Sequence, residues 1–271
     1  MSAFEFRTVN INAGGVLNNS GTDLVLGGGS TTFIGSQSVN GGRIDLGGQS
    51  LLLRGGLLVN NGGDFASGNG VRNGTTVVDF GGLAKGDGYY SSIVTQNGGV
   101  YSPGNSPGRG EIGNFVINSG GTLLIEINDA TGVAGPTSGL TRGWDMVSVE
   151  TLELNSTASD NFLVSLRSLL APSGDLPGLA DHFDANLAFS WKIIDVTGST
   201  NGVFDPLAFR LDTSNFLNQT NGGQFSLSSL GGDIFLNFTP LITAVPEPSS
   251  ALTVAIATAL LFCRRPARCR R

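Results

Sequence analysis

Short apolar runs separated by glycine make up the first half of the chain. Five such runs cover residues 8–11, 23–26, 43–46, 50–53 and 75–78, and glycine pairs or triplets lie between them. Strands of about four residues are shorter than those of an immunoglobulin-type sandwich and are typical of β-solenoid rungs. Because the glycine clusters are six to twenty-two residues apart, we expect an imperfect parallel β-solenoid, without a strict repeat, over residues 1–110.

The polar positions between these runs predict tight corners. Glycine adopts positive φ without steric cost, and asparagine tolerates it better than most residues. Asparagine pairs stand beside glycine or serine in "VLNNSG" (16–21) and "LVNNGG" (58–63). We therefore expect asparagine and glycine to share the corners of the solenoid.

The pattern changes over residues 111–240. Loops lengthen, and apolar and polar positions alternate over residues 162–166, 189–196, 224–230 and 233–238. This alternation, with Gly231 and Gly232 between the last two runs, predicts antiparallel hairpins. The fold class is therefore all-β, with residues 111–240 as a second β region that continues or caps the stack, or forms a β-sandwich-like unit.

A third segment, residues 241–271, has a pattern of its own. It contains "VPEPSS", an uncharged run from Ala251 to Phe262, and then five arginines. As a short C-terminal hydrophobic helix, twelve residues would rise about 18 Å, less than the roughly 30 Å of a bilayer core. The arginine cluster would hold its end in the cytoplasm and leave residues 1–244 outside.

Charge and cysteine usage divide the chain in the same way. Residues 1–244 carry a net charge of −10 and residues 245–271 a net charge of +4. An acidic body argues against a nucleic-acid partner. Cys263 and Cys269 both lie in the C-terminal segment, and a body without thiols fits an exported protein.

The order of the C-terminal elements resembles the PEP-CTERM sorting signal of exported bacterial proteins. The resemblance covers the last 27 residues or so of the chain and implies processing by a membrane-embedded exosortase that cuts near the Pro-Glu-Pro motif. By this resemblance the sorting motif is Val245, Pro246, Glu247 and Pro248, and the residues that retain the chain in the membrane are Arg264, Arg265, Arg268, Arg270 and Arg271. The chain would be anchored transiently in the inner membrane and then reach the cell surface or the extracellular space.

The body resembles the β-helical passenger modules of autotransporters and of many PEP-CTERM proteins. The clearest match is residues 98–127, with the corner "SPGNSPG" from Ser102 to Gly108, followed by "GWDMVSVETLEL" (143–154). Two prolines without N–H groups and two glycines describe a rigid corner, so we interpret this marker as structural rather than catalytic. Members of the family begin with a secretory signal, whereas this chain begins "MSAFEFRTVN". We expect the true start to lie upstream.

Candidate catalytic chemistry is sparse. The single histidine, His182, stands between Asp181 and Asp184, with neither the G-x-S-x-G elbow of a serine hydrolase nor further ligands for tetrahedral zinc. We interpret it as part of a solvated loop. Two acid groups were considered as glycosidase or lyase carboxylates: Asp145 with Glu150 and Glu153, and Asp205 with Asp212. We expect Asp145, Glu150 and Glu153 to lie on solvent-facing positions of a strand over residues 144–154.

These observations predict a protein without catalytic residues, metal or cofactor, although calcium binding by loop aspartates stays open. We expect an exported structural or adhesive protein of the cell surface or extracellular matrix, associated with exopolysaccharide, with exosortase as its processing partner and polysaccharide or like copies as further partners. One alternative is a β-helix carbohydrate-active enzyme, which requires an acid cluster in a groove. Another is an ice-binding protein, because a similar tail occurs on some of these. It requires regular Thr-x-Thr ranks, whereas threonines cluster only in "STTF" (30–33) and "GTTVV" (74–78).

Overall fold

The computed structural model describes residues 37–61, 70–136, 142–171 and 176–241, together with the backbone of five short strands before residue 37. Residues 1–240 form one compact unit. Its described elements are β-strands, apart from the single 3-10 turn η1 (Pro206–Ala208). The expected all-β fold with parallel strands is confirmed. The C-terminal helix expected over residues 251–262 lies outside the described residues.

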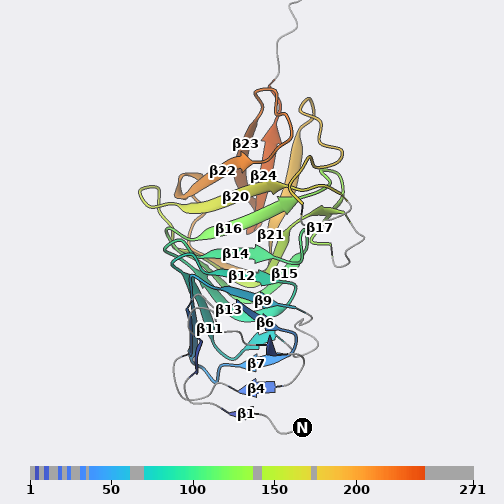
Figure 1. Cartoon of the computed structure of the whole chain (residues 1–271). Coiled ribbons are helices and arrows are strands. Elements are labelled where there is room, and N and C mark those ends of the chain that lie inside the picture. Colours follow the sequence, from blue (N-terminus) through green and yellow to red (C-terminus); the bar gives the residue numbers. More distant parts are fainter. Residues whose placement is uncertain are drawn as a thin grey trace, which may run out of the picture. The chain divides into compact units, whose positions relative to one another are not determined.

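Three ranks of parallel strands, visited in turn by the chain, form the first part of the stack (Figure 1). The first rank contains β1 (Phe4–Glu5), β4 (Asp23–Val25), β7 (Arg43–Asp45) and β10 (Gly70–Arg72). The second contains β2 (Val9–Ile11), β5 (Thr31–Ile34), β8 (Ser50–Arg54) and β11 (Thr75–Asp79). The third contains β3 (Asn18–Asn19), β6 (Gln37–Asn40), β9 (Leu57–Asn60), β12 (Leu83–Gly86) and β14 (Val100–Pro103).

Beyond these rungs the first two ranks merge. Strand β13 (Tyr89–Thr95) is long enough to pair with both, since Tyr90 pairs with Val71 of β10 and Ile93 with Thr76 of β11. The merged sheet continues through β15 (Arg109–Ile117), β19 (Met146–Leu154) and β21 (Phe189–Asn201). The third rank continues through β16 (Thr122–Ile127), β20 (Phe162–Ser168) and β22 (Phe209–Asn215). The stack thus changes from three ranks of strands to two sheets, and β15 spans the boundary expected near residue 110.

Strand register reveals a repeat that glycine spacing does not. Phe4 pairs with Leu24 and Leu24 with Ile44, so the first rungs are 20 residues apart. Later rungs depart from this value because loops are inserted, and Ile112 pairs with Val149, 37 residues away. The absence of any regular spacing was therefore wrong for the first rungs. Glycine hides the repeat because each rung has several corners.

The last strands form an antiparallel hairpin against the merged sheet. Strand β24 (Asp233–Thr239) pairs antiparallel with β21 on one side and with β23 (Gln224–Leu230) on the other. Gly231 and Gly232, with φ of 66° and 100°, form the turn between β23 and β24. The predicted hairpin is confirmed. Residues 162–166, also expected in a hairpin, instead lie in β20, which pairs in parallel with β16 and β22. Two further short strands, β17 (Val133–Ala134) and β18 (Gly143–Trp144), extend the edge of β16.

The core follows directly from strand alternation, because every second residue of a strand points inward. Ile44, Leu53 and Ile93 are fully buried between the ranks. Toward the C-terminal hairpin the core becomes aromatic, and the rings of Phe183 and Phe238 lie 4.9 Å apart. The rungs therefore stack on one continuous apolar core.

Asparagine has a different role from the one expected at "LVNNGG". Asn60 is the last residue of β9 and is fully buried. Its Oδ1 accepts a hydrogen bond of 2.8 Å from Nδ2 of Asn40, one rung earlier, and its Nδ2 donates to the carbonyl oxygen of Tyr89 at 3.0 Å. Asn40 also bonds the backbone of Gly42. These asparagines therefore satisfy buried backbone groups at the corner instead of adopting its positive φ.

Candidate functional site

The sorting motif, residues 245–248, and the arginine cluster, residues 264–271, lie outside the described residues. Their assignment stays a prediction from the sequence. Within the described ranges, no helix is long and apolar enough to cross a membrane.

The corner from Ser102 to Gly108 is closed by an aspartate that follows it by 37 residues. Oδ1 of Asp145 accepts a hydrogen bond of 2.6 Å from the N–H of Gly108, and Oδ2 accepts one of 2.9 Å from the N–H of Glu126. Met146 N–H donates to the carbonyl oxygen of Gly108 at 3.0 Å. The two most recognisable segments of the sequence, "SPGNSPG" and "GWDMVSVETLEL", are therefore joined through one carboxylate.

Glycine is required inside this corner because two stretches of backbone touch. A Cβ on Gly104 would lie 2.3 Å from the Cα of Gly108, closer than any real contact. Gly104 also has a φ of 69°, which favours glycine. The structural interpretation of the marker agrees with this geometry.

Asp145 corrects one expectation directly. It is fully buried, not solvent-facing, whereas Glu150 is exposed and Glu153 is half-buried. Burial raises the pKa of Asp145 well above its usual range, and the nearby charge of Glu126 raises it further. The two backbone N–H groups oppose this rise because they favour the ionised form.

Glu126 belongs to the same buried group. Its Oε1 lies 3.1 Å from Nη1 of Arg167, the residue beside it in the register of β16 and β20. Its side chain is 4% exposed, while that of Arg167 is 38% exposed. One side of this acid pair is thus neutralised by arginine, and the other is bound to the backbone. Such an arrangement fixes the fold and leaves little room for a sugar between the two acids.

His182 lies in a loop, as expected, but its partner is Asp129. Its Nδ1 is 3.0 Å from Oδ1 of Asp129, and its side chain is 63% exposed. Burial tends to raise the pKa of Asp129, but hydrogen bonds from Thr131 and His182 outweigh it and lower the pKa overall. Of the two flanking acids, Asp181 pairs with Arg142 at 2.6 Å, and Asp184 accepts hydrogen bonds from Asn186.

The other acid group considered, Asp205 with Asp212, is divided between two turns. Asp205 accepts a hydrogen bond of 2.9 Å from the N–H of Leu207, and Asp212 accepts one of 3.0 Å from the N–H of Ser214. Hydrogen bonds from Ser214 lower the pKa of Asp212. Across the described residues, no group of three or more histidine, cysteine or acidic side chains is placed to hold a metal ion.

A flat outer surface runs along the second rank and the merged sheet. One rank of small polar residues is aligned across neighbouring strands: Ser50 with Thr75, Ser92 with Asn114, Asn114 with Thr151, and Thr151 with Ser199. Beside it runs an apolar rank in which Leu52 pairs with Val77, Val77 with Val94 and Val94 with Val116. We call these two ranks the outer strip. Its members range from exposed to barely buried.

Threonine does not form a regular rank on this strip. Of the two threonines in "GTTVV", Thr75 is half-buried on the strip and Thr76 is fully buried in the core. The side chains of "STTF" lie outside the described residues. In the described part of the strip, serine, asparagine and aliphatic residues take most positions. The Thr-x-Thr ranks that would favour ice binding are not formed there.

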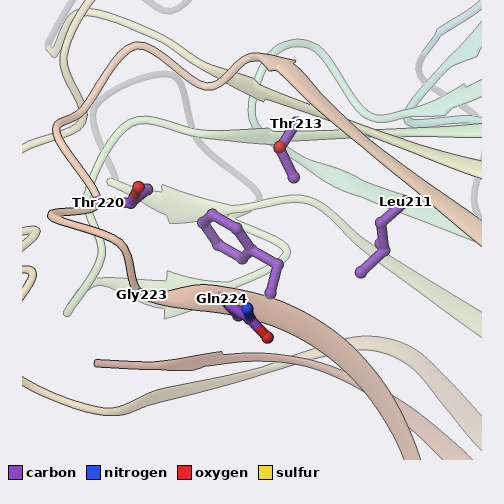
Figure 2. A pocket seen from close by; sticks show the side chains of 6 residues that line it. Leu211, Thr213, Thr220, Gly223 and Gln224 are labelled. Carbon is purple, nitrogen blue, oxygen red and sulfur yellow. The ribbon is translucent and has the colours of Figure 1, made fainter. Parts of the chain in front are cut away.

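One further hollow lies near the end of the stack. A groove of about 340 Å³ is lined by residues of β22, of β23 and of the loop between them (Figure 2): Leu211, Thr213, Thr220, Gly223, Gln224 and Phe225. It contains no ionisable side chain. Nothing in the sequence analysis indicated this groove, because its walls come from strands that do not pair with each other.

No protein-family profile matches this chain, and comparison with curated proteins gives no significant match.

Proposed function

We propose that this chain is a non-catalytic, exported structural or adhesive protein that holds extracellular polysaccharide on its outer strip. The observation that carries the proposal is the strip itself, in which a polar rank runs beside an apolar one across successive strands. Neighbouring strands lie about 4.8 Å apart, so both ranks repeat at this short interval. A sugar ring offers hydroxyl groups at its edge and C–H groups on its face, which suit these two ranks.

The charges of the molecule favour a neutral polysaccharide. The chain has a net charge of −6, so an acidic polymer would be repelled at low ionic strength. Between Ser50 and Thr151 the polar rank has no charged member. The acids described above are bound by arginine, by histidine or by backbone N–H groups, which supports a binding function over a hydrolytic one. Export and sorting through residues 245–271 belong to the proposal and rest on the sequence.

Binding can be tested by co-sedimentation with microcrystalline cellulose, a neutral probe, and by retardation in gels that contain pectate, an acidic one. We expect binding to cellulose and little to pectate. Ser92→Glu places a charge in the middle of the strip and should weaken cellulose binding about tenfold, equivalent to about 1.4 kcal/mol. Ser159→Glu, in the turn between β19 and β20, is the matched control and should bind normally.

Two outcomes would contradict the proposal. Equal loss of binding in both variants would indicate a general charge effect and not a site. Release of soluble sugars during incubation, abolished by replacing one carboxylate, would show that the chain is an enzyme.

A further inference from the structure

The merged sheet ends in a strand whose outer edge has no partner among the described residues. Strand β23 pairs with β24 along all seven residues on one side, and no described strand pairs with it on the other. The backbone N–H and C=O groups of such an edge are free to pair with another chain. Proteins usually protect long edges with charge, proline or a bulge.

Strand β23 has none of these protections. Its sequence, "QFSLSSL", has no charged residue and no proline, and its register with β24 is unbroken. The last strand of the other sheet differs, because β22 contains Arg210 and Asp212. The contrast identifies β23 as the edge on which a further strand can add.

The core is also open beside β23. Phe225 and Leu227 stand opposite Phe238 and Leu236, which are buried, so all four point to the core side of the sheet. Yet Phe225 and Leu227 are only half-buried, and Phe225 lines the groove shown in Figure 2. Apolar side chains on the core side of a sheet lose their exposure only if another strand or side chain covers them.

We propose that β23 pairs antiparallel with β23 of a second copy of this chain, across a two-fold axis at Leu227. In this register Phe225 would face Ser229 of the other copy, a large residue opposite a small one, and Ser226 would face Ser228. The same strand serves both partners, as a two-fold interface requires. Two acidic molecules would otherwise repel each other, so an edge without charge is where they can approach most closely.

This inference goes beyond the proposed function and does not rest on export or on sugar binding. It is tested on the full chain, kept in mild detergent because of residues 251–262, by sedimentation velocity from about 1 μM to about 1 mM. The native chain should pass from monomer to dimer. Ser229→Lys places a charge opposite Phe225 of the other copy and should leave a monomer throughout. Ala158→Lys, in an exposed turn away from β23, is the matched control and should dimerise.

Every other outcome overturns the proposal. A native chain that stays monomeric shows that the edge is covered from within or needs no partner. Dimers in all three proteins show that another surface, such as the C-terminal segment, associates. Loss of dimers in both variants shows a nonspecific charge effect. Because Ser229 is exposed, Ser229→Lys should fold normally. Amide hydrogen exchange in native β23 should also slow as concentration rises, and unchanged exchange contradicts the pairing without any variant.

Discussion

Asp145 is the residue on which the most distant parts of one rung depend. Its two oxygens each accept a backbone N–H, one from Gly108 and one from Glu126. Asparagine has the same shape but only one acceptor oxygen, and its NH₂ group would face one of these donors. We expect Asp145→Asn to lower the free energy of unfolding by about 1 to 3 kcal/mol at pH 5, measured in urea. Asp184→Asn, on the surface, should change it by less than about 0.5 kcal/mol.

The penalty should also depend on pH, with a definite sign. A carboxyl group whose pKa is raised by folding binds its proton more tightly in the folded chain. Its stabilising effect is complete below the unfolded pKa of about 3.9 and is lost as the pH rises toward the folded value. The native chain should therefore lose stability relative to Asp145→Asn between these two pKa values. A penalty that grows with pH in this window would contradict the raised pKa.

At the residue scale, sequence reasoning reached the local roles and missed the distant ones. The solvated loop of His182 was predicted, but its pairing with Asp129 joins residues 53 positions apart. Asp145 was placed on a solvent face because it precedes an alternating strand. Its burial depends on Gly108 and Glu126, which arrive from other rungs. No local pattern contains that information.

At the element scale, the two glycines of one corner have separate tasks. Gly98 has a φ of 82°, and a Cβ there would meet nothing closer than 3.8 Å. Gly99 has no such φ, but its Cβ would lie 1.9 Å from the carbonyl oxygen of Val78 in the preceding rung. The pairs Gly81–Gly82 and Gly120–Gly121 repeat this division. The first glycine turns the chain, and the second lets two rungs approach.

This division predicts an order that backbone strain alone would reverse. Gly98→Ala should cost about 1 to 2 kcal/mol, the strain of a left-handed alanine. Gly99→Ala should cost at least about 3 kcal/mol, because the rungs must separate. Each variant serves as the control of the other, and urea unfolding monitored by circular dichroism measures both. If Gly98→Ala is the more damaging, strain and not close approach governs the corner.

The strands and corners themselves were accessible from sequence because both depend on neighbouring residues. Short apolar runs predicted β7, β8 and β11, and glycine pairs predicted the corners between them. Strand direction was less accessible. Alternation is the same in a parallel strand such as β20 as in an antiparallel one such as β23, so only the Gly231–Gly232 turn identified the hairpin.

At the scale of the whole molecule, the stack grows by insertion. The first rungs need 20 residues, whereas Val149 pairs with Val196, 47 residues away. The additional chain supplies longer strands and the aromatic core near the hairpin. Glycine spacing could not show this growth, because register joins residues by their place in the rung and not by their distance along the chain.

The C-terminal segment sets a prediction for the molecule as a whole. A plain membrane anchor depends on its apolar length, so changing the turn before it should have no effect. A processing signal depends on that turn, because Pro246 and Pro248 hold Glu247 extended and accessible to a protease. In a host with its exosortase, we expect Glu247→Ala to leave uncut precursor in the inner membrane. Deleting residues 264–271 should instead release unprocessed chain, because the arginines hold the short helix in place.

The mass of the mature protein distinguishes the two cases. Processing near residue 247 removes Cys263 and Cys269, so the surface form should contain no thiol and should not react with a maleimide label. The Glu247→Ala precursor should retain both cysteines and react. Pro240→Ala, outside the motif, is the matched control and should be cut normally. If the native surface protein still carries both thiols, residues 245–271 are an anchor, and the sorting part of the proposed function is wrong.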